Sequence, residues 1–177
     1  MPFREVEIRP GMIAWFDVEA LNNDRQVIQP ASPPTRVGPF VCVEKVGGRS
    51  VWTEFTHVYS ADRLLIDQSW IVNRPKAWGA DETYLNDGRT TYVGPDRSFV
   101  DAASAQDTYQ GTTSRPYLNR DGVAAVIREI RLRGGQLLAP PTEGDPLAEE
   151  AIAQSDRGQG EGSDREQPAN GGSAAQQ

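Results

Sequence analysis

Cysteine and histidine are nearly absent from this chain of 177 residues, which holds one of each, Cys42 and His57. A single cysteine excludes an internal disulfide, and its place in the apolar run at 39–43 indicates a small buried side chain. One cysteine and one histidine cannot supply the usual ligand sets of zinc proteins, and no carboxylates follow the spacing of an EF-hand loop. The sequence therefore predicts no disulfide framework, no metal site and no other cofactor.

Several functional motifs and all long apolar runs are also missing. The chain has no glycine-rich loop ending in Lys-Ser or Lys-Thr and no Gly-x-Ser-x-Gly, which disfavours a P-loop nucleotide hydrolase and an α/β-hydrolase. No apolar stretch approaches the roughly 20 residues of a membrane-spanning helix, and residues 1–7 contain no apolar signal segment. We therefore expect a soluble cytoplasmic protein with no membrane partner.

Lysine is scarce too, because 16 of the 18 basic residues are arginine. The net charge of −7 comes mainly from residues 139–177, where eight acids and two bases give −6, so residues 1–138 carry 17 acids, 16 bases and a net −1. Arginine suits planar contacts with phosphate, although codon usage in a G- and C-rich genome also produces an arginine excess. The near-neutral part of the chain is therefore compatible with a nucleic-acid partner.

Aromatic residues stop before residue 139, and the only large apolar side chains after it are Leu147 and Ile152. Such a segment buries too little apolar area to offset the entropy lost on ordering. The sequence predicts one domain at 1–138 and a disordered acidic tail at 139–177. The tail is interpreted either as a solvating extension or as an electrostatic mimic of nucleic acid.

What the sequence does contain is a series of short β patterns separated by glycine and proline. The clearest is a hairpin in which Gly47-Gly48 joins residues 40–46 to 49–56, because two glycines supply the positive φ angles of a tight turn. A polar connection at 21–34 follows the first strand. The other expected strands are 12–18, 63–66, the pair 82–85 and 89–93 joined as a hairpin by Asn86-Asp87-Gly88, and a short one ending at Val100.

One amphipathic helix is expected at 121–133, where Val123, Val126, Ile127 and Ile130 recur at helical spacing. Asn119 or Asp121 caps its start, and Gly134-Gly135 follows its last turn. The pattern at 67–72 fits a short helix or a strand equally. Five or six short strands and one terminal helix predict a mainly β fold, an SH3-like small β-barrel with a C-terminal amphipathic helix.

The segment Pro10-Gly11-Met12-Ile13-Ala14-Trp15-Phe16-Asp17 is an apolar strand that follows a glycine and ends in aspartate. It resembles the Gly-Asp-Ile-type strand, also ending in aspartate, that opens the MazF/PemK family of toxin endoribonucleases. The family continues with an Arg-Pro pair before an apolar strand and with a strand ending in Pro-x-Thr. The segments 36–43 and 51–56 occupy similar places. The resemblance covers residues 8–57 and extends to the helix at 121–133, and it implies an SH3-like barrel that usually forms a homodimer.

The resemblance also implies metal-independent cleavage of single-stranded RNA, by an active or a degenerate member of a toxin-antitoxin system. Such cleavage needs a base for the 2′-hydroxyl, an acid for the leaving oxygen and a donor for the phosphorane charge. Arg36 is the expected cation and Thr56 the expected hydrogen-bond donor. The candidates for proton exchange are His57, Glu54 and Glu19. Strand alternation would place Thr56 and His57 on opposite faces, which favours a structural role for the histidine.

A second function of another class remains open: a non-catalytic small β-barrel that binds a protein or nucleic-acid partner. Trp78 lies in the loop Pro75-Lys76-Ala77-Trp78-Gly79, where an exposed indole suits a partner surface. Arg74, Arg89 and Arg97 accompany aromatic residues that could stack on single-stranded bases, whereas core packing is the alternative for each aromatic side chain. The expected partners are thus single-stranded RNA or an antitoxin-like protein.

Overall fold

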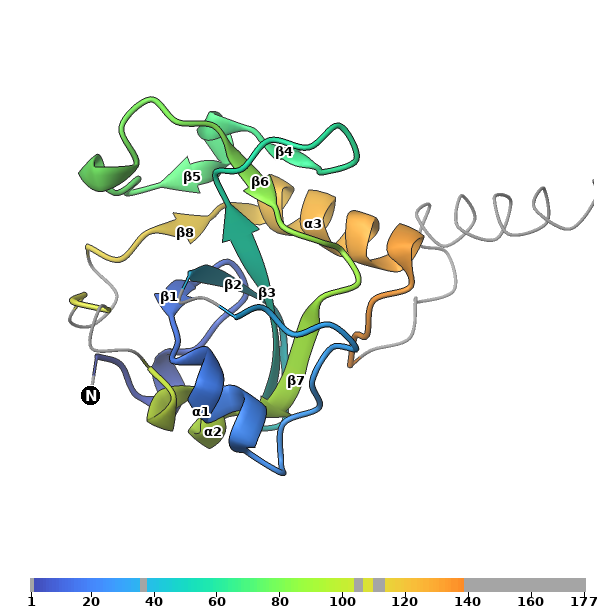
Figure 1. The fold of residues 1–177 in the computed structure, drawn as a ribbon. Helices are drawn as coiled ribbons and strands as arrows, with labels where there is room; N and C mark the ends of the chain where they lie inside the picture. Colours follow the sequence, from blue (N-terminus) through green and yellow to red (C-terminus); the bar gives the residue numbers. More distant parts are fainter. Residues whose placement is uncertain (1, 36–37, 104–106, 110–113, 139–177) are drawn as a thin grey trace, which may run out of the picture. The chain divides into compact units, whose positions relative to one another are not determined.

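The computed structural model describes residues 2–35, 38–103, 107–109 and 114–138, all within a compact unit at Met1–Pro140 (Figure 1). The fold is mainly β, with an antiparallel six-stranded sheet and a C-terminal helix, which confirms this part of the prediction. The strands are β1 Ile13–Trp15, β2 Pro39–Val46, β3 Arg49–Thr56, β4 Leu65–Ile66, β5 Ile71–Val72, β6 Thr83–Leu85, β7 Thr91–Pro95 and β8 Tyr117–Leu118. The α-helices are α1 Val18–Asn23, α2 Asp96–Asp101 and α3 Arg120–Arg133, and single 3-10 turns lie at Glu5–Glu7, Gln68–Trp70 and Lys76–Trp78.

Strands β2 and β3 form the predicted hairpin. Gly47 and Gly48 have φ angles of 57° and 79°, and the register brings Val46 opposite Arg49. The register shifts at a bulge between Cys42 and Glu44. The turn type therefore sets the longest strand pair of the sheet, as the sequence indicated.

Besides β2, strand β3 pairs with two further strands. Its first five residues pair with β7, whereas Phe55 and Thr56 pair with β6, and β4 then lies on the other side of β6. The predicted hairpin of 82–85 with 89–93 is therefore wrong, because both segments run antiparallel to β3 and pair with it. The segment at 86–90 leaves the sheet between them, and the hydroxyl of Thr53 donates to the Thr90 carbonyl oxygen at 2.9 Å.

Other element boundaries also differ from expectation. The segment ending at Val100 forms α2 rather than a strand, because Pro95 precedes a turn that buries Phe99 and Val100. Asp17 ends the first strand by capping α1, where its carboxylate accepts hydrogen bonds from the amides of Glu19 and Ala20. Residues 67–72 contain both a 3-10 turn and β5, and α3 begins one residue before the predicted start.

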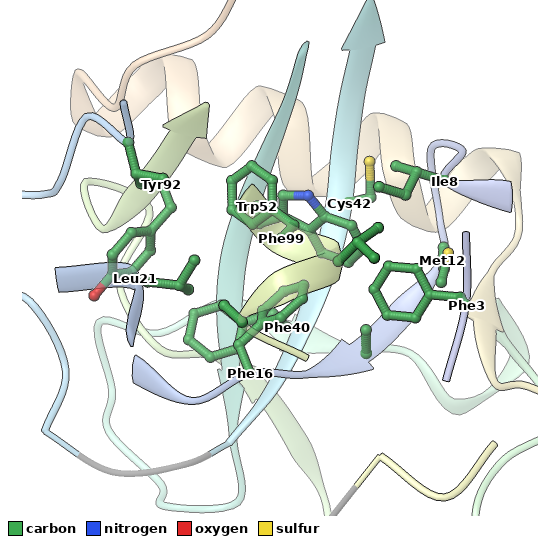
Figure 2. Close-up of a cluster of buried hydrophobic side chains, with 14 of the residues drawn as sticks. Phe3, Ile8, Met12, Phe16, Leu21, Phe40, Cys42, Trp52, Tyr92 and Phe99 are labelled. Atoms are coloured by element: carbon green, nitrogen blue, oxygen red, sulfur yellow. The ribbon is translucent and has the colours of Figure 1, made fainter. Parts of the chain in front are cut away.

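The central strands are buried on both faces. On one face Phe16, Phe40 and Trp52 pack with residues of α1 and α2, and Figure 2 shows these rings together with Phe99. The opposite face carries a second cluster that joins residues of the sheet to Val126 and Ile130 of α3. Successive side chains along β2 and β3 therefore point alternately into the first and the second core.

The strand pairings of the described residues do not close the sheet. Its order is β1-β2-β3-β6-β4, with β7 also on β3, and a separate pair joins β5 to β8. Isolated bridges connect Met12 to Tyr117 and Ile28 to Val93. No helix in this described part of the chain is long and apolar enough to cross a membrane.

Candidate functional site

Glu54 is a buried carboxyl group near the end of β3. Its residue is 7% exposed, and the side-chain amide of Asn86 donates to Oε2 at 2.6 Å. Burial raises the pKa of Glu54, while the Asn86 hydrogen bond and the nearby Arg63 guanidinium oppose that shift. A carboxyl group whose pKa lies above its usual range is suited to proton transfer near neutral pH.

A chain of hydrogen bonds links Glu54 to Arg63 and Thr56. The Arg63 guanidinium donates from Nε to the Asn86 carbonyl oxygen at 2.9 Å and from Nη1 to the Val58 carbonyl oxygen at 2.6 Å. The Val58 amide in turn donates to the Thr56 hydroxyl at 3.1 Å. Glu54 and Thr56 are two residues apart on β3 and so belong to the same strand face. The site thus combines a carboxyl, a hydroxyl and a fixed cation.

Beside this group lies a polar pocket with a volume of about 290 Å³. Its wall comes from the segments at 60–64 and 85–90, from Ser32 and from the last turns of α3. Arg63 and Asn86 belong both to the pocket lining and to the Glu54 network. The pocket and the hydrogen-bond network of Glu54 are therefore adjacent and share these two residues.

Two glycines hold the turn at 86–90 against α3. A Cβ on Gly135 would lie 2.1 Å from the Gly88 carbonyl oxygen, and a Cβ on Gly88 would lie 3.0 Å from the Glu129 carbonyl oxygen. Real Cβ atoms essentially never lie closer than 3.0 Å to such a neighbour. A side chain at position 135 would therefore push α3 away from the turn, so the pocket requires a glycine there. The Arg133 guanidinium adds a hydrogen bond to the Asp62 carbonyl oxygen, which ties the segment at 60–64 to α3.

The structure places the predicted catalytic residues in different surroundings. Arg36 lies outside the described residues. Glu54 and Thr56 are brought together with Arg63, as described above. His57 is exposed, its Nδ1 lies 2.9 Å from the Glu82 carbonyl oxygen, and its ring packs edge-on against Trp78. Glu19 is exposed on α1, where its amide donates to Asp17.

The predicted partner-binding residues do not form an exposed aromatic surface. Trp78 is 7% exposed and belongs to the second core, so an exposed indole at this position is wrong. Arg74 lies over the Trp78 ring, with its Cζ 5.9 Å from the ring centroid. Arg89 is exposed and bonds Asp87, whereas Arg97 is exposed and bonds Asp101.

Sequence reasoning missed Arg63, Asn86 and Arg133. The sequence predicted Asn86 as part of a turn and Arg63 as the first residue of a strand, so neither residue carried a local signal of a functional role. Only the pairing of β6 with β3 brings Asn86 to Glu54.

A buried ion pair was also missed. Arg115 Nη1 lies 2.7 Å from Asp107 Oδ2, and the two side chains are 2% and 0% exposed. Asp107 also accepts from the Trp15 amide, and Arg115 donates to the carbonyl oxygens of Ile13 and Tyr109. These bonds tie the segment before β8 to β1, so Arg115 stabilises the fold.

Among the residues that the structure describes, no group of three histidine, cysteine or acidic side chains is arranged to hold a metal ion. Comparison of the chain with family models, curated proteins and solved structures finds no match.

Proposed function

We propose that this protein is a metal-independent endoribonuclease of the MazF/PemK kind that acts on single-stranded RNA. The observation that carries the proposal is the buried Glu54 carboxyl with a raised pKa, hydrogen-bonded through Asn86 to Arg63 at the edge of a polar pocket. The proposal includes the SH3-like barrel, the homodimer and the antitoxin-like partner that the family resemblance implies.

In this reaction the ionised Glu54 carboxylate accepts the proton of a ribose 2′-hydroxyl. The 2′-oxygen attacks the adjacent phosphorus, the bond to the 5′-oxygen breaks, and that oxygen takes a proton from water. The products are a 2′,3′-cyclic phosphate and a 5′-hydroxyl. Arg63 stabilises the phosphorane charge, and Thr56 keeps its own hydroxyl proton for a phosphate oxygen because its oxygen accepts from Val58.

The test is cleavage of a labelled single-stranded RNA pool in EDTA. Wild type, Glu54→Gln, Arg63→Gln and Thr56→Val are compared after circular dichroism confirms that each is folded. We expect Glu54→Gln and Arg63→Gln to reduce the rate about 100-fold or more and Thr56→Val to reduce it less. Arg36→Ala tests the cation that the family resemblance implies.

The matched control is Arg128→Gln, which removes an exposed arginine of α3. This variant should cleave at the wild-type rate, because Arg128 lies outside the site. That result would show that the slower cleavage by Arg63→Gln is not caused by a general loss of positive charge. Absence of cleavage by the wild type on every RNA, or equal rates in all folded variants, would rule out this nuclease.

An exposed apolar patch supports a second candidate, the non-catalytic interaction module. Val58, Tyr59 and Leu65 are 66%, 72% and 48% exposed. Tyr59 packs edge-on against Tyr84 with ring centroids 5.9 Å apart, and Leu65 pairs with Tyr84 across β4 and β6. A protein partner would bind here rather than at Trp78.

The variant Tyr59→Ser distinguishes the two candidate functions. The module requires loss of partner binding with this variant and no RNA cleavage by the wild type. The nuclease requires cleavage that Tyr59→Ser leaves unchanged.

A further inference from the structure

The polar pocket beside Glu54 contains charged groups besides Arg63, which the cleavage chemistry already uses. Its lining includes the guanidinium groups of Arg63 and Arg133 and the carboxylates of Asp62, Asp87 and Glu129. Two positive and three negative side chains give a net charge of −1, which is unfavourable for a phosphate ion. A neutral ligand with hydrogen-bond donors and acceptors fits this balance better.

The volume of the pocket limits the size of the ligand that it can hold. A volume of about 290 Å³ is near the lower limit of small-molecule pockets, so it holds one planar base and excludes a stacked pair. The half-buried Leu64 adds apolar surface against which the face of a ring can pack. Proteins that read single-stranded RNA commonly take up one unstacked base in this manner.

Glu129 and Arg133 supply adjacent groups of opposite hydrogen-bonding character. They stand four residues apart on α3, and Arg133 Nε lies 2.8 Å from Glu129 Oε1. The Arg133 side chain is 38% exposed and the Glu129 side chain is 18% exposed. Guanine presents the O6 acceptor next to its N1 and N2 donors. Arg133 matches O6, and the Glu129 carboxylate matches N1–H and N2–H. Adenine places an amino donor where guanine has O6, facing Arg133.

We infer that this pocket binds one guanine base of the RNA, with Glu129 and Arg133 reading its Watson–Crick edge. This inference rests on the proposed function, since it names the base that accompanies the cleaved phosphate. Guanine packs against Leu64 while Arg63, shared by the pocket and the Glu54 network, faces the phosphate.

Binding of single nucleotides tests the pocket without any cleavage. The full-length protein is titrated with GMP, AMP, CMP and UMP, which share one phosphate and differ only in the base, and binding is followed by NMR shifts of backbone amides. GMP should bind about tenfold more tightly than AMP and shift amides at 86–90 and in the last turns of α3. Glu129→Gln and Arg133→Gln should each remove about tenfold of the GMP affinity and leave the AMP affinity unchanged.

The matched controls are Asp121→Asn and Arg128→Gln, which change exposed charges on the same helix and should keep the wild-type preference for GMP. Equal affinity for the four nucleotides, no binding of GMP, or shifts that map away from the pocket would overturn the inference.

Sequencing the ends of cleaved RNA separates this inference from the proposed function. RNA that is cut with no enrichment of guanine, and equally by Glu129→Gln, leaves the nuclease and removes the guanine pocket. Selective GMP binding in a protein that cuts no RNA keeps the pocket and removes the nuclease.

Discussion

Among single residues, Glu54 links the proposed chemistry to stability. Its folded-state pKa lies above the ordinary value of 4.5 because the carboxyl is buried. Below that value the group is protonated in both states. As pH rises, the unfolded chain loses this proton first, so the free energy of unfolding falls until the folded-state pKa is passed.

We predict that Glu54→Gln removes this fall. Urea unfolding of wild type and variant from about pH 4 to about pH 8 should show the stability of wild type decreasing relative to the variant. The carboxyls with lowered pKa, such as Asp87, are unchanged in both proteins and cancel in the difference. A difference that is constant with pH would show that Glu54 titrates normally.

The buried pair of Arg115 and Asp107 should contribute far more to stability than an exposed pair. We predict that Asp107→Asn lowers the free energy of unfolding by about 3–5 kcal/mol, because it removes the carboxylate charge that is paired with the buried Arg115 guanidinium. The control is Asp101→Asn, whose partner Arg97 is exposed and where the expected loss is at most about 1 kcal/mol. Urea denaturation measures both, and similar losses would contradict a structural role for the buried pair.

At the scale of elements, two adjacent glycines end α3 for different reasons. Gly134 has a φ of 74° with open space around its Cβ position, whereas a Cβ on Gly135 would meet the Gly88 carbonyl oxygen at 2.1 Å. We predict a loss of about 1 kcal/mol for Gly134→Ala, from backbone strain alone. Gly135→Ala should lose about 1–3 kcal/mol more, because α3 must move away from the turn at 86–90.

Only the second of these substitutions should disturb the pocket. Thermal unfolding gives the two stabilities, and NMR shifts at 86–90 report on the pocket. Equal losses, or unchanged shifts in Gly135→Ala, would show that the close backbone contact does not shape this site.

Elements were predictable where local chemistry decided them. The Gly47-Gly48 hairpin and the Asn119-capped α3 carry their turn and cap residues in the sequence. The pairing of β6 and β7 with β3 did not follow from Asn86-Asp87-Gly88, because a turn motif favours a local reversal and carries no information on which other strand the flanking segments pair with. Here β3 lies along both segments, and its pairing with each replaces the hairpin.

For the whole molecule, the uneven charge along the chain gives a further prediction. Removing residues 141–177 deletes eight acids and two bases and changes the net charge from −7 to −1. Because the two cores lie within residues 3–138, we expect the free energy of unfolding to change by less than about 0.5 kcal/mol in urea. RNA affinity should rise at low salt, since a net charge of −6 no longer repels phosphate.

The same truncation separates the two interpretations of the tail. If the tail is a solvating extension, adding it back as a separate peptide leaves RNA affinity unchanged. If it mimics nucleic acid, the peptide competes with RNA at micromolar concentrations. A loss of stability above about 1 kcal/mol on truncation would instead show that the tail packs on the domain.

The sequence by itself determined the β-rich class, the central hairpin, the terminal helix and the strong division of charge, because turn glycines, caps, apolar periodicity and composition act locally. Only the tertiary structure decided that β3 pairs with both β6 and β7 in addition to β2, that Trp78 is buried and that Glu54, Asn86 and Arg63 meet beside one pocket. The contact of Glu54 with Asn86 joins residues 32 positions apart, and the pairing of β3 with β7 joins Arg49 to Pro95, 46 positions apart. They depend on which strands pair and which face each strand buries, and these are settled by the packing of two cores rather than by any short segment.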